Sequence, residues 1–195
     1  MTSTLRCSLG LFVVLSLCLP HVQAAHLDLG PMLGHVGSND ARIWVKASEA
    51  SRLGVWIGQE ADLADAKRVE GPMLDKTEDC NGHIRVDGLK PSTQTAPPDG
   101  VSTHLRFAFG SCVGHRSSLA AAAWGQMATD TSLGMLLMLG DNHYADSTDP
   151  AIQRAAYYDH RSVAGFRDVT GRTPTLGIWD DHDFGPNNSD RTAEG

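Results

Sequence analysis

The sequence has few cysteines, little positive charge and only one long apolar run. Four of the 195 residues are cysteine, and 16 lysine and arginine residues stand against 23 aspartate and glutamate residues, so the formal net charge is -7. This balance argues against a nucleic acid or an anionic membrane as the main partner. Apolar residues make up 41% of the chain, which is enough for a packed core and argues against disorder.

The one long apolar run lies near the N-terminus. It spans residues 7–19, with Arg6 before it, and Pro20 and a cleavage-like VQA segment after it. A run this short is marginal for crossing a bilayer, which is the alternative interpretation. The pattern predicts a cleavable signal peptide over residues 1–24, a secreted or periplasmic location and no stable membrane anchor.

Two cysteines remain after the predicted cleavage, Cys80 and Cys112. In an oxidising compartment two thiols can form a single disulfide. Cys112 can also be a thiolate metal ligand or a small buried apolar residue, because cysteine serves in all three ways. The residue pattern alone leaves these interpretations open.

The first part of the mature chain is typical of an all-β domain. Short segments rich in Val, Ile and Trp lie at residues 41–48 and 52–58, and an alternating segment lies at 82–91. Their length and spacing predict a small β-sandwich of the immunoglobulin or fibronectin III type over residues 25–91. The polar, proline-bearing stretch 92–102 is predicted to be a linker.

The pattern changes to α/β over residues 103–195. Strands are predicted at 104–112 and 134–141, the second as a continuous apolar run expected to be buried on both faces, and a third strand begins near Thr173. Helices are predicted at 117–128 and from Pro150 onward, each with a capping residue before it. The β-α-β-α-β order predicts a parallel sheet.

Each predicted strand of this sheet ends in polar residues. In an open α/β sheet the ligand site lies beyond the carboxyl ends of the strands, so these residues are expected to converge. A thiol, a phenol, imidazoles and several carboxylates in one crevice would suit metal ions, because so many carboxylates repel one another unless a cation compensates them. Taken singly, each residue also has a purely structural interpretation: Asp141 as a turn residue or helix cap, His143 and Tyr144 as surface polar groups, and DDHD as a solvated loop. Their joint placement at three strand ends makes these interpretations less favoured. The segments are GSC ending at Cys112, GDNHY ending at Tyr144, and DDHD ending at Asp183.

Four motifs together resemble the PhoD-like alkaline phosphatase D family of metallophosphatases. They are FAFGSC (107–112), LGDNHYAD (139–146), IWDDHDFGPNNSD (178–190) and, upstream, GPMLGHVGSNDARIWVKAS (30–48). The resemblance covers about residues 28–195. It implies an N-terminal sandwich followed by a calcineurin-like domain that hydrolyses phosphate monoesters and diesters outside the cytoplasm, with calcium and ferric iron as cofactors.

The resemblance also implies residue roles. Asp141 matches the carboxylate that bridges the metals, Cys112 and Tyr144 match the iron ligands, and Asp181 matches a ligand to the second metal. His182 matches the histidine that contacts phosphate and protonates the leaving group, and Asp183 is expected to orient it. Further groups that support the ligands or contact the substrate are expected among Asp180, Asn188, Arg116, His115 and His143.

Two departures from the family pattern predict an incomplete enzyme. The linker follows Pro91 where family members carry further sandwich strands, and the chain ends at Gly195, before the later strands that supply additional metal ligands. We therefore expect a fragment of an enzyme acting on small phosphate esters. A non-catalytic exported metal-binding or adhesion protein is the alternative. The sequence leaves the substrate, the preference for monoesters or diesters and the oligomeric state open.

Overall fold

The computed structural model describes residues 25–58, 63–89, 104–114 and 116–192. The predicted signal peptide, the linker 92–102 and His115 lie outside the described residues. None of the helices in the described ranges is long and apolar enough to cross a membrane.

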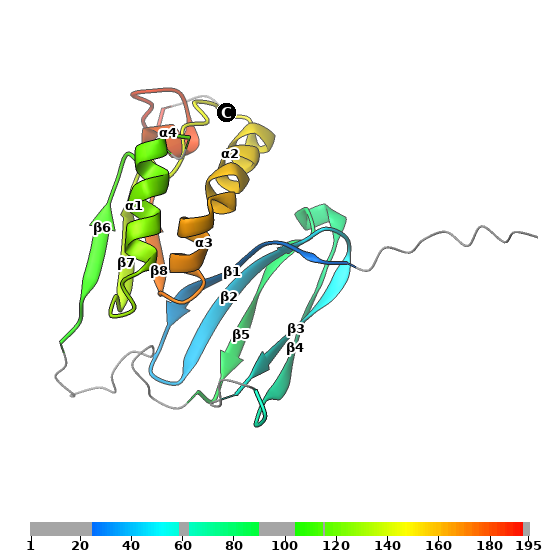
Figure 1. Cartoon of the computed structure of the whole chain (residues 1–195). Helices are drawn as coiled ribbons and strands as arrows, with labels where there is room; N and C mark the ends of the chain where they lie inside the picture. The colour runs from blue at the N-terminus through cyan, green and yellow to red at the C-terminus, as the bar shows by residue number, and fades with distance from the viewer. Residues whose placement is uncertain (1–24, 59–62, 90–103, 115, 193–195) are drawn as a thin grey trace, which may run out of the picture.

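Two antiparallel sheets form the first part of the chain (Figure 1). The larger has the order β1-β2-β5, and the smaller pairs β3 with β4. The two sheets enclose a small core of Val45, Ala47 and Leu74, against which Ile43 and Leu53 pack. The prediction of an all-β region is confirmed, whereas β1 and β4 were not predicted as separate strands. The elements are β1 (Leu27–Val36), β2 (Asp40–Ala47), β3 (Ser51–Ile57), β4 (Lys67–Leu74), a 3-10 turn η1 (Lys76–Glu78) and β5 (Asn81–Asp87).

A parallel three-stranded sheet forms the second part, as predicted. Its order is β6-β7-β8, and both strand pairs run parallel. Ser117 caps α1 by accepting a hydrogen bond from the Leu119 amide, and Asp149 caps α2 in the same way, with Pro150 in the first turn. The elements are β6 (Phe107–Gly110), α1 (Ser118–Ala128), β7 (Met135–Leu139), α2 (Pro150–Ser162), α3 (Ala164–Thr170), β8 (Thr175–Ile178) and α4 (Asp181–Phe184).

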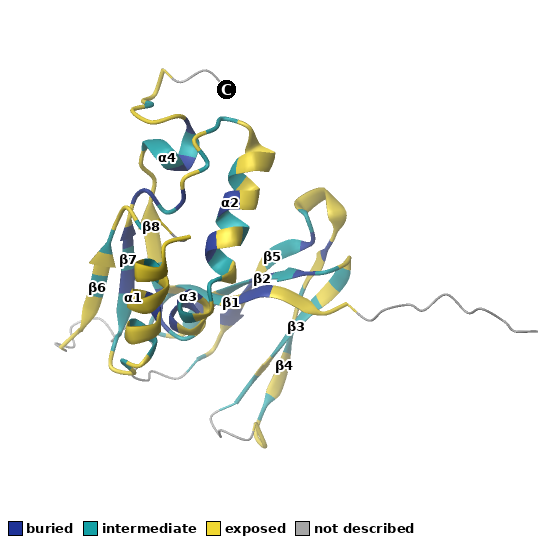
Figure 2. Ribbon diagram, turned by 45° about the horizontal axis from the view of Figure 1, so that its top comes forward, coloured by how far each residue is buried: buried dark blue, intermediate teal, exposed yellow. Residues whose placement is uncertain are grey.

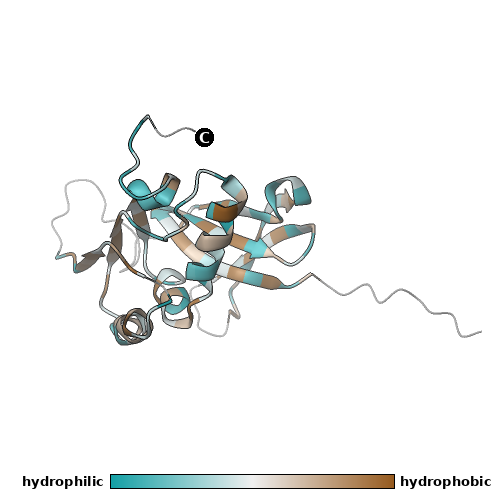
Figure 3. Cartoon of the chain, turned by 90° about the horizontal axis from the view of Figure 1, so that it is seen from above, coloured by the Kyte–Doolittle hydropathy of each residue, from teal (hydrophilic) through white to brown (hydrophobic). Residues whose placement is uncertain are grey.

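Among the described residues, helices cover one face of the parallel sheet and not the other. Leu136 and Met138 of β7 point toward α1 and α3 and join Trp124, Phe166 and Val169 in the main core. On the opposite face Leu139 of β7 is 41% exposed, and Phe109 and Ile178 on the flanking strands are 66% and 61% exposed. The prediction that the second strand is buried on both faces is therefore wrong. Figure 2 shows the exposed residues on β6 and β8, and Figure 3 shows how apolar this sheet is.

The antiparallel sheets pack directly against the α/β part. Met32 of β1 contacts the main core, and β1 runs beside α3 and β8. At the start of β5, the Asn81 side-chain amide donates a 3.3 Å hydrogen bond to the Tyr158 hydroxyl of α2. These contacts hold α2 against the antiparallel sheet, so the position of α2 depends on both parts of the chain.

Two short helices differ from the sequence prediction. The helical pattern after Pro150 is broken at Val163, whose extended backbone separates α2 from α3. The DDHD segment, expected to be the end of a strand and a loop, forms the helix α4. Asp180 and Asp183 make a reciprocal capping box around the first turn of α4, which accounts for helix formation there.

Replacement of Trp124 tests the main core. Trp124 is 4% exposed and packs edge-to-face on Phe166 with ring centroids 4.9 Å apart. We expect Trp124→Ala to lower the free energy of unfolding by about 3–5 kcal/mol, because the cavity cannot be refilled by its neighbours. The matched control is Leu119→Ala on the same helix, which is 80% exposed and should change stability by less than about 0.5 kcal/mol. Urea unfolding followed by circular dichroism measures both, and equal effects of the two variants would contradict this core assignment.

Candidate metal centre

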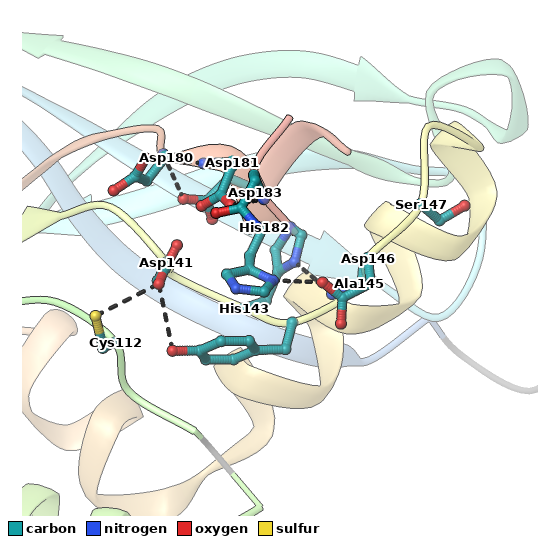
Figure 4. Close-up of polar contacts among 12 residues, drawn as sticks. Cys112, Asp141, His143, Ala145, Asp146, Ser147, Asp180, Asp181, His182 and Asp183 are labelled. Atoms are coloured by element: carbon teal, nitrogen blue, oxygen red, sulfur yellow. Dashed lines mark hydrogen bonds and ion pairs between the residues drawn. The ribbon is translucent and has the colours of Figure 1, made fainter. Parts of the chain in front are cut away.

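Three chain segments bring the predicted site residues together (Figure 4). Cys112 follows β6, Asp141 follows β7, and Asp181 and His182 begin α4 just after β8. The parallel pairing puts the carboxyl ends of all three strands at one edge of the sheet, so residues far apart in sequence become neighbours. Ligand-capable atoms of Asp141, Asp181 and His182 lie within 4.8 Å of one another.

Left-handed backbone conformations concentrate in this region. Cys112, Asp141 and Asp146 have φ of 59°, 49° and 50°, and Asn188, close to α4, has φ of 64°. Residues other than glycine rarely adopt such values, and where they do the strain is often associated with a functional site. Gly140 has φ of 95°, and a Cβ there would lie 2.6 Å from Cβ of Asp180. This close approach of Gly140 to Asp180 is possible only without a side chain.

Asp141 lies at the centre of the cluster. It is 8% exposed, and its Oδ2 lies 3.4 Å from Sγ of Cys112 and 3.4 Å from the hydroxyl of Tyr144. A carboxylate, a thiol and a phenol therefore meet at one point, and these are donors suited to a transition metal through sulfur and phenolate and to a hard cation through oxygen.

Negative charge accumulates here without a compensating lysine or arginine among the described side chains. Burial, together with Asp141 and Cys112, raises the pKa of Tyr144 to about 12. The raised pKa means that the neighbouring acids oppose formation of a phenolate. A bound cation would reverse this effect, because it stabilises every anionic donor at once. The donor set therefore fits metal ions.

Asp181 and His182 are each oriented by a partner. The Asn188 amide donates to the Asp181 carboxylate, and this hydrogen bond lowers the pKa of Asp181. His182 forms an ion pair through Nδ1 with Asp146, which raises the pKa of the imidazole. Its ring also lies 4.5 Å from the ring of Tyr144. Because Asp146 engages Nδ1, Nε2 is the ring nitrogen of His182 that could contact a substrate or another ligand.

Asp183 does not orient His182, contrary to the prediction. The buried Asp183 carboxylate accepts hydrogen bonds from the amides of Asn142 and Asp180, both at 2.9 Å, and from the Asn142 side chain at 3.1 Å. It thus ties the loop after β7 to the start of α4. Asp180 caps the start of α4, because its side chain accepts a hydrogen bond from the Asp181 amide. Both aspartates hold the backbone that carries the candidate ligands.

The remaining predicted residues lie outside the cluster. His143 is fully buried, accepts a hydrogen bond from the Ala145 amide and packs its ring against Tyr157. Arg116 has an 80% exposed side chain and forms an ion pair with Asp159 of α2. Cys80 and Cys112 are both free thiols, which excludes the disulfide interpretation in this structure.

Two contributors to the site were not assigned from the sequence. Asp146 lies within the LGDNHYAD motif, and its place three residues after His143 gave no indication that it would reach His182. Asn142 is held at both its backbone and its side chain by Asp183, and its side chain also donates to the Ile178 carbonyl at 2.8 Å. Both contacts join segments more than 30 residues apart, so no local spacing rule could have found them.

Comparisons with known proteins support the fold. The family described as "Domain of unknown function (DUF7800)" matches residues 24–97. A solved structure titled "Structure of PhoD" is similar with a TM-score of 0.71 at 18% identity, covering 86% of this chain and 41% of that one. The chain therefore spans less than half the length of that protein, and the likeness shows a PhoD-like fold. No curated protein sequence matches the chain.

Replacement of Gly140 tests the backbone geometry of the centre. We expect Gly140→Ala to lower the free energy of unfolding by about 2 kcal/mol or more, because a Cβ would meet Asp180 and alanine disfavours a positive φ. Gly125→Ala is the matched control, since a Cβ at this position of α1 meets nothing within 4 Å. Alanine should stabilise the helix there by about 0.5–1 kcal/mol. Opposite signs in urea unfolding support the geometry, and a stable Gly140→Ala variant would contradict it.

Proposed function

We propose that this chain carries part of a two-metal centre that hydrolyses phosphate esters. The observation that supports the proposal most directly is the meeting of Cys112, Asp141 and Tyr144 within hydrogen-bond distance, beside Asp181 and His182. These are the donors expected for ferric iron through thiolate and phenolate and for calcium through carboxylate oxygen. The PhoD-like fold agrees with this function.

Each residue has a distinct proposed role. Asp141 would bridge two cations, Cys112 and Tyr144 would hold iron, and Asp181 would hold the second cation. When bound, such a pair supplies Lewis acidity to the phosphoryl oxygens and lowers the pKa of a bound water. Asp183, through the Asn142 and Asp180 amides, keeps the ligand-bearing segments in register.

His182 would donate a proton to the departing oxygen of the ester. Its Nδ1 is engaged by Asp146, so the other ring nitrogen is the one available for this step. Asp146 favours the protonated imidazole, which is the form that an acid catalyst needs. We assign to Asp146 the orienting role first expected of Asp183.

The proposed setting follows from the sequence alone. The N-terminal apolar run and its VQA ending support export, so the protein is proposed to act on small phosphate esters in a secreted or periplasmic location. Metal binding by the same donors without turnover would correspond to the alternative, an exported protein that binds metal or serves in adhesion without catalysis.

Removal of Asp141 tests the centre. The protein is loaded with calcium and iron, its metal content is measured by mass spectrometry, and turnover is assayed with p-nitrophenyl phosphate and its bis ester. We expect Asp141→Asn to weaken cation binding by more than about tenfold and to abolish turnover, as metal removal by a chelator should. Asp168→Asn, an exposed position on α3, is the matched control and should retain both properties. Metal binding without turnover in the parent chain would favour the non-catalytic alternative, and absence of metal would contradict the centre itself.

The leaving group tests the role of His182. We expect His182→Ala to reduce kcat/KM for an alkyl phosphate by about 10²–10⁴, because an alkoxide needs a proton as it departs. The loss for p-nitrophenyl phosphate should be much smaller, since nitrophenolate leaves without help. His83→Ala, on the exposed side of β5, serves as control. Equal losses for both esters would show that His182 acts in binding and not as an acid.

A further inference from the structure

Arg161 of α2 lies at the junction between the antiparallel sheets and the α/β part, away from the candidate metal centre. Its guanidinium carbon lies 4.4 Å from the ring centre of Trp44 on β2 and 5.1 Å from that of Tyr157 on its own helix. Figure 2 shows α2 beside β2, the strand to which Trp44 belongs. Burial is the main influence on Arg161 and lowers the pKa of its guanidinium.

This partly buried guanidinium has no carboxylate partner in the described part of the chain. Arg68, Arg85, Arg106 and Arg116 are more exposed, and each of them forms an ion pair with an aspartate or glutamate. Arg161 forms none and makes no hydrogen bond to a described residue. An unpaired cation withdrawn from water costs stability, and contact with two aromatic rings offsets only part of that cost. The N–H groups of Arg161 thus remain available to an anion from outside.

Two adjoining hollows meet at Arg161. One, of about 210 Å3, has a mainly apolar lining that includes Met32, Phe166 and Trp179, and the other, of about 310 Å3, includes Trp44, Glu78 and Arg154. Tyr157 and Arg161 line both, and the two hollows on either side of them are here called the Arg161 groove. Glu78 makes no ion pair with Arg154 or Arg161, and the wider half carries two arginines against this one carboxylate.

We propose that the Arg161 groove binds a small carboxylate that has a flat apolar body. The planar fork of arginine matches the two oxygens of a carboxylate, and aromatic and methionine side chains on either side match an apolar body. A carboxylate carries one negative charge, which one guanidinium can neutralise. A phosphate monoester carries close to two and would leave charge uncompensated in the narrower hollow. None of the proposed metal ligands lines the groove, although Asn142, which Asp183 holds, lines its narrower half.

Benzoate is a suitable probe, and the indole N–H signals of the four tryptophans provide the readout by two-dimensional NMR of the chain. Saturable shifts are expected for Trp44 and Trp179, which line the groove, and none for Trp56 on β3. Benzamide has the same ring without the charge and should cause no saturable shift. Phenyl phosphate should bind more weakly than benzoate.

Three variants separate binding from folding. Arg161→Gln should weaken benzoate binding by at least about tenfold, and Arg161→Lys, which keeps the charge but not the fork, should weaken it less. Arg167→Gln on α3 is the matched control and should bind as the parent does. Without benzoate, Arg161→Gln should be at least as stable as the parent, because it removes an unpaired charge.

Other results would overturn the proposal. These are absence of saturation at millimolar benzoate, equal binding of benzamide, tighter binding of phenyl phosphate, or unchanged binding by Arg161→Gln. Marked destabilisation by Arg161→Gln would show instead that the guanidinium serves the packing of α2 on β2. None of these outcomes depends on metal content or ester hydrolysis, so the groove and the proposed function can fail independently.

Discussion

The parallel pairing of β6, β7 and β8 is the constraint on which the candidate centre depends. It puts Cys112, Asp141 and the start of α4 at one edge of the sheet, although 69 positions separate Cys112 from Asp181. After β6 and β7 the backbone then turns through left-handed residues, at Cys112 and at Gly140 and Asp141, whereas after β8 it enters the helix α4. Every polar contact of the centre follows from these two features, because without them the donors would be dispersed along the chain.

Asp183 connects the second and third strand ends, and this has an energetic consequence. A buried carboxylate is costly unless it is fully hydrogen-bonded. Asp183 meets that requirement with two backbone amides and the Asn142 side chain. Burial, followed by the negative charge of Asp183, raises the pKa of Tyr157 to about 12. Tyr157 also lines both halves of the Arg161 groove. The metal centre and the groove therefore share one supporting helix, α2.

In the described chain, helices cover one face of the parallel sheet. Such a sheet buries less apolar surface than one with helices on both faces. The helices α1 and α3 bury Leu136 and Met138, while Phe107, Phe109 and Ile178 remain exposed in the described chain. Met32 of β1 adds to the covered side, because it packs against the same core as α1 and α3. The chain covers 41% of the similar solved structure, so the match concerns a minority of that protein.

Much of the fold was determined locally and could be predicted from the sequence. Apolar alternation, Ser117, Asp149 and Pro150 located the strands and helices, and the strand-helix order implied the parallel sheet and the convergence of Cys112, Asp141 and Asp181. Partners of single side chains could not be predicted in this way. The pairing of His182 with Asp146, the turning of Asp183 toward backbone amides and the position of Arg161 between Trp44 and Tyr157 join distant segments. Periodicity and caps report which residues share an element, whereas only packing in three dimensions decides which atoms of different elements meet.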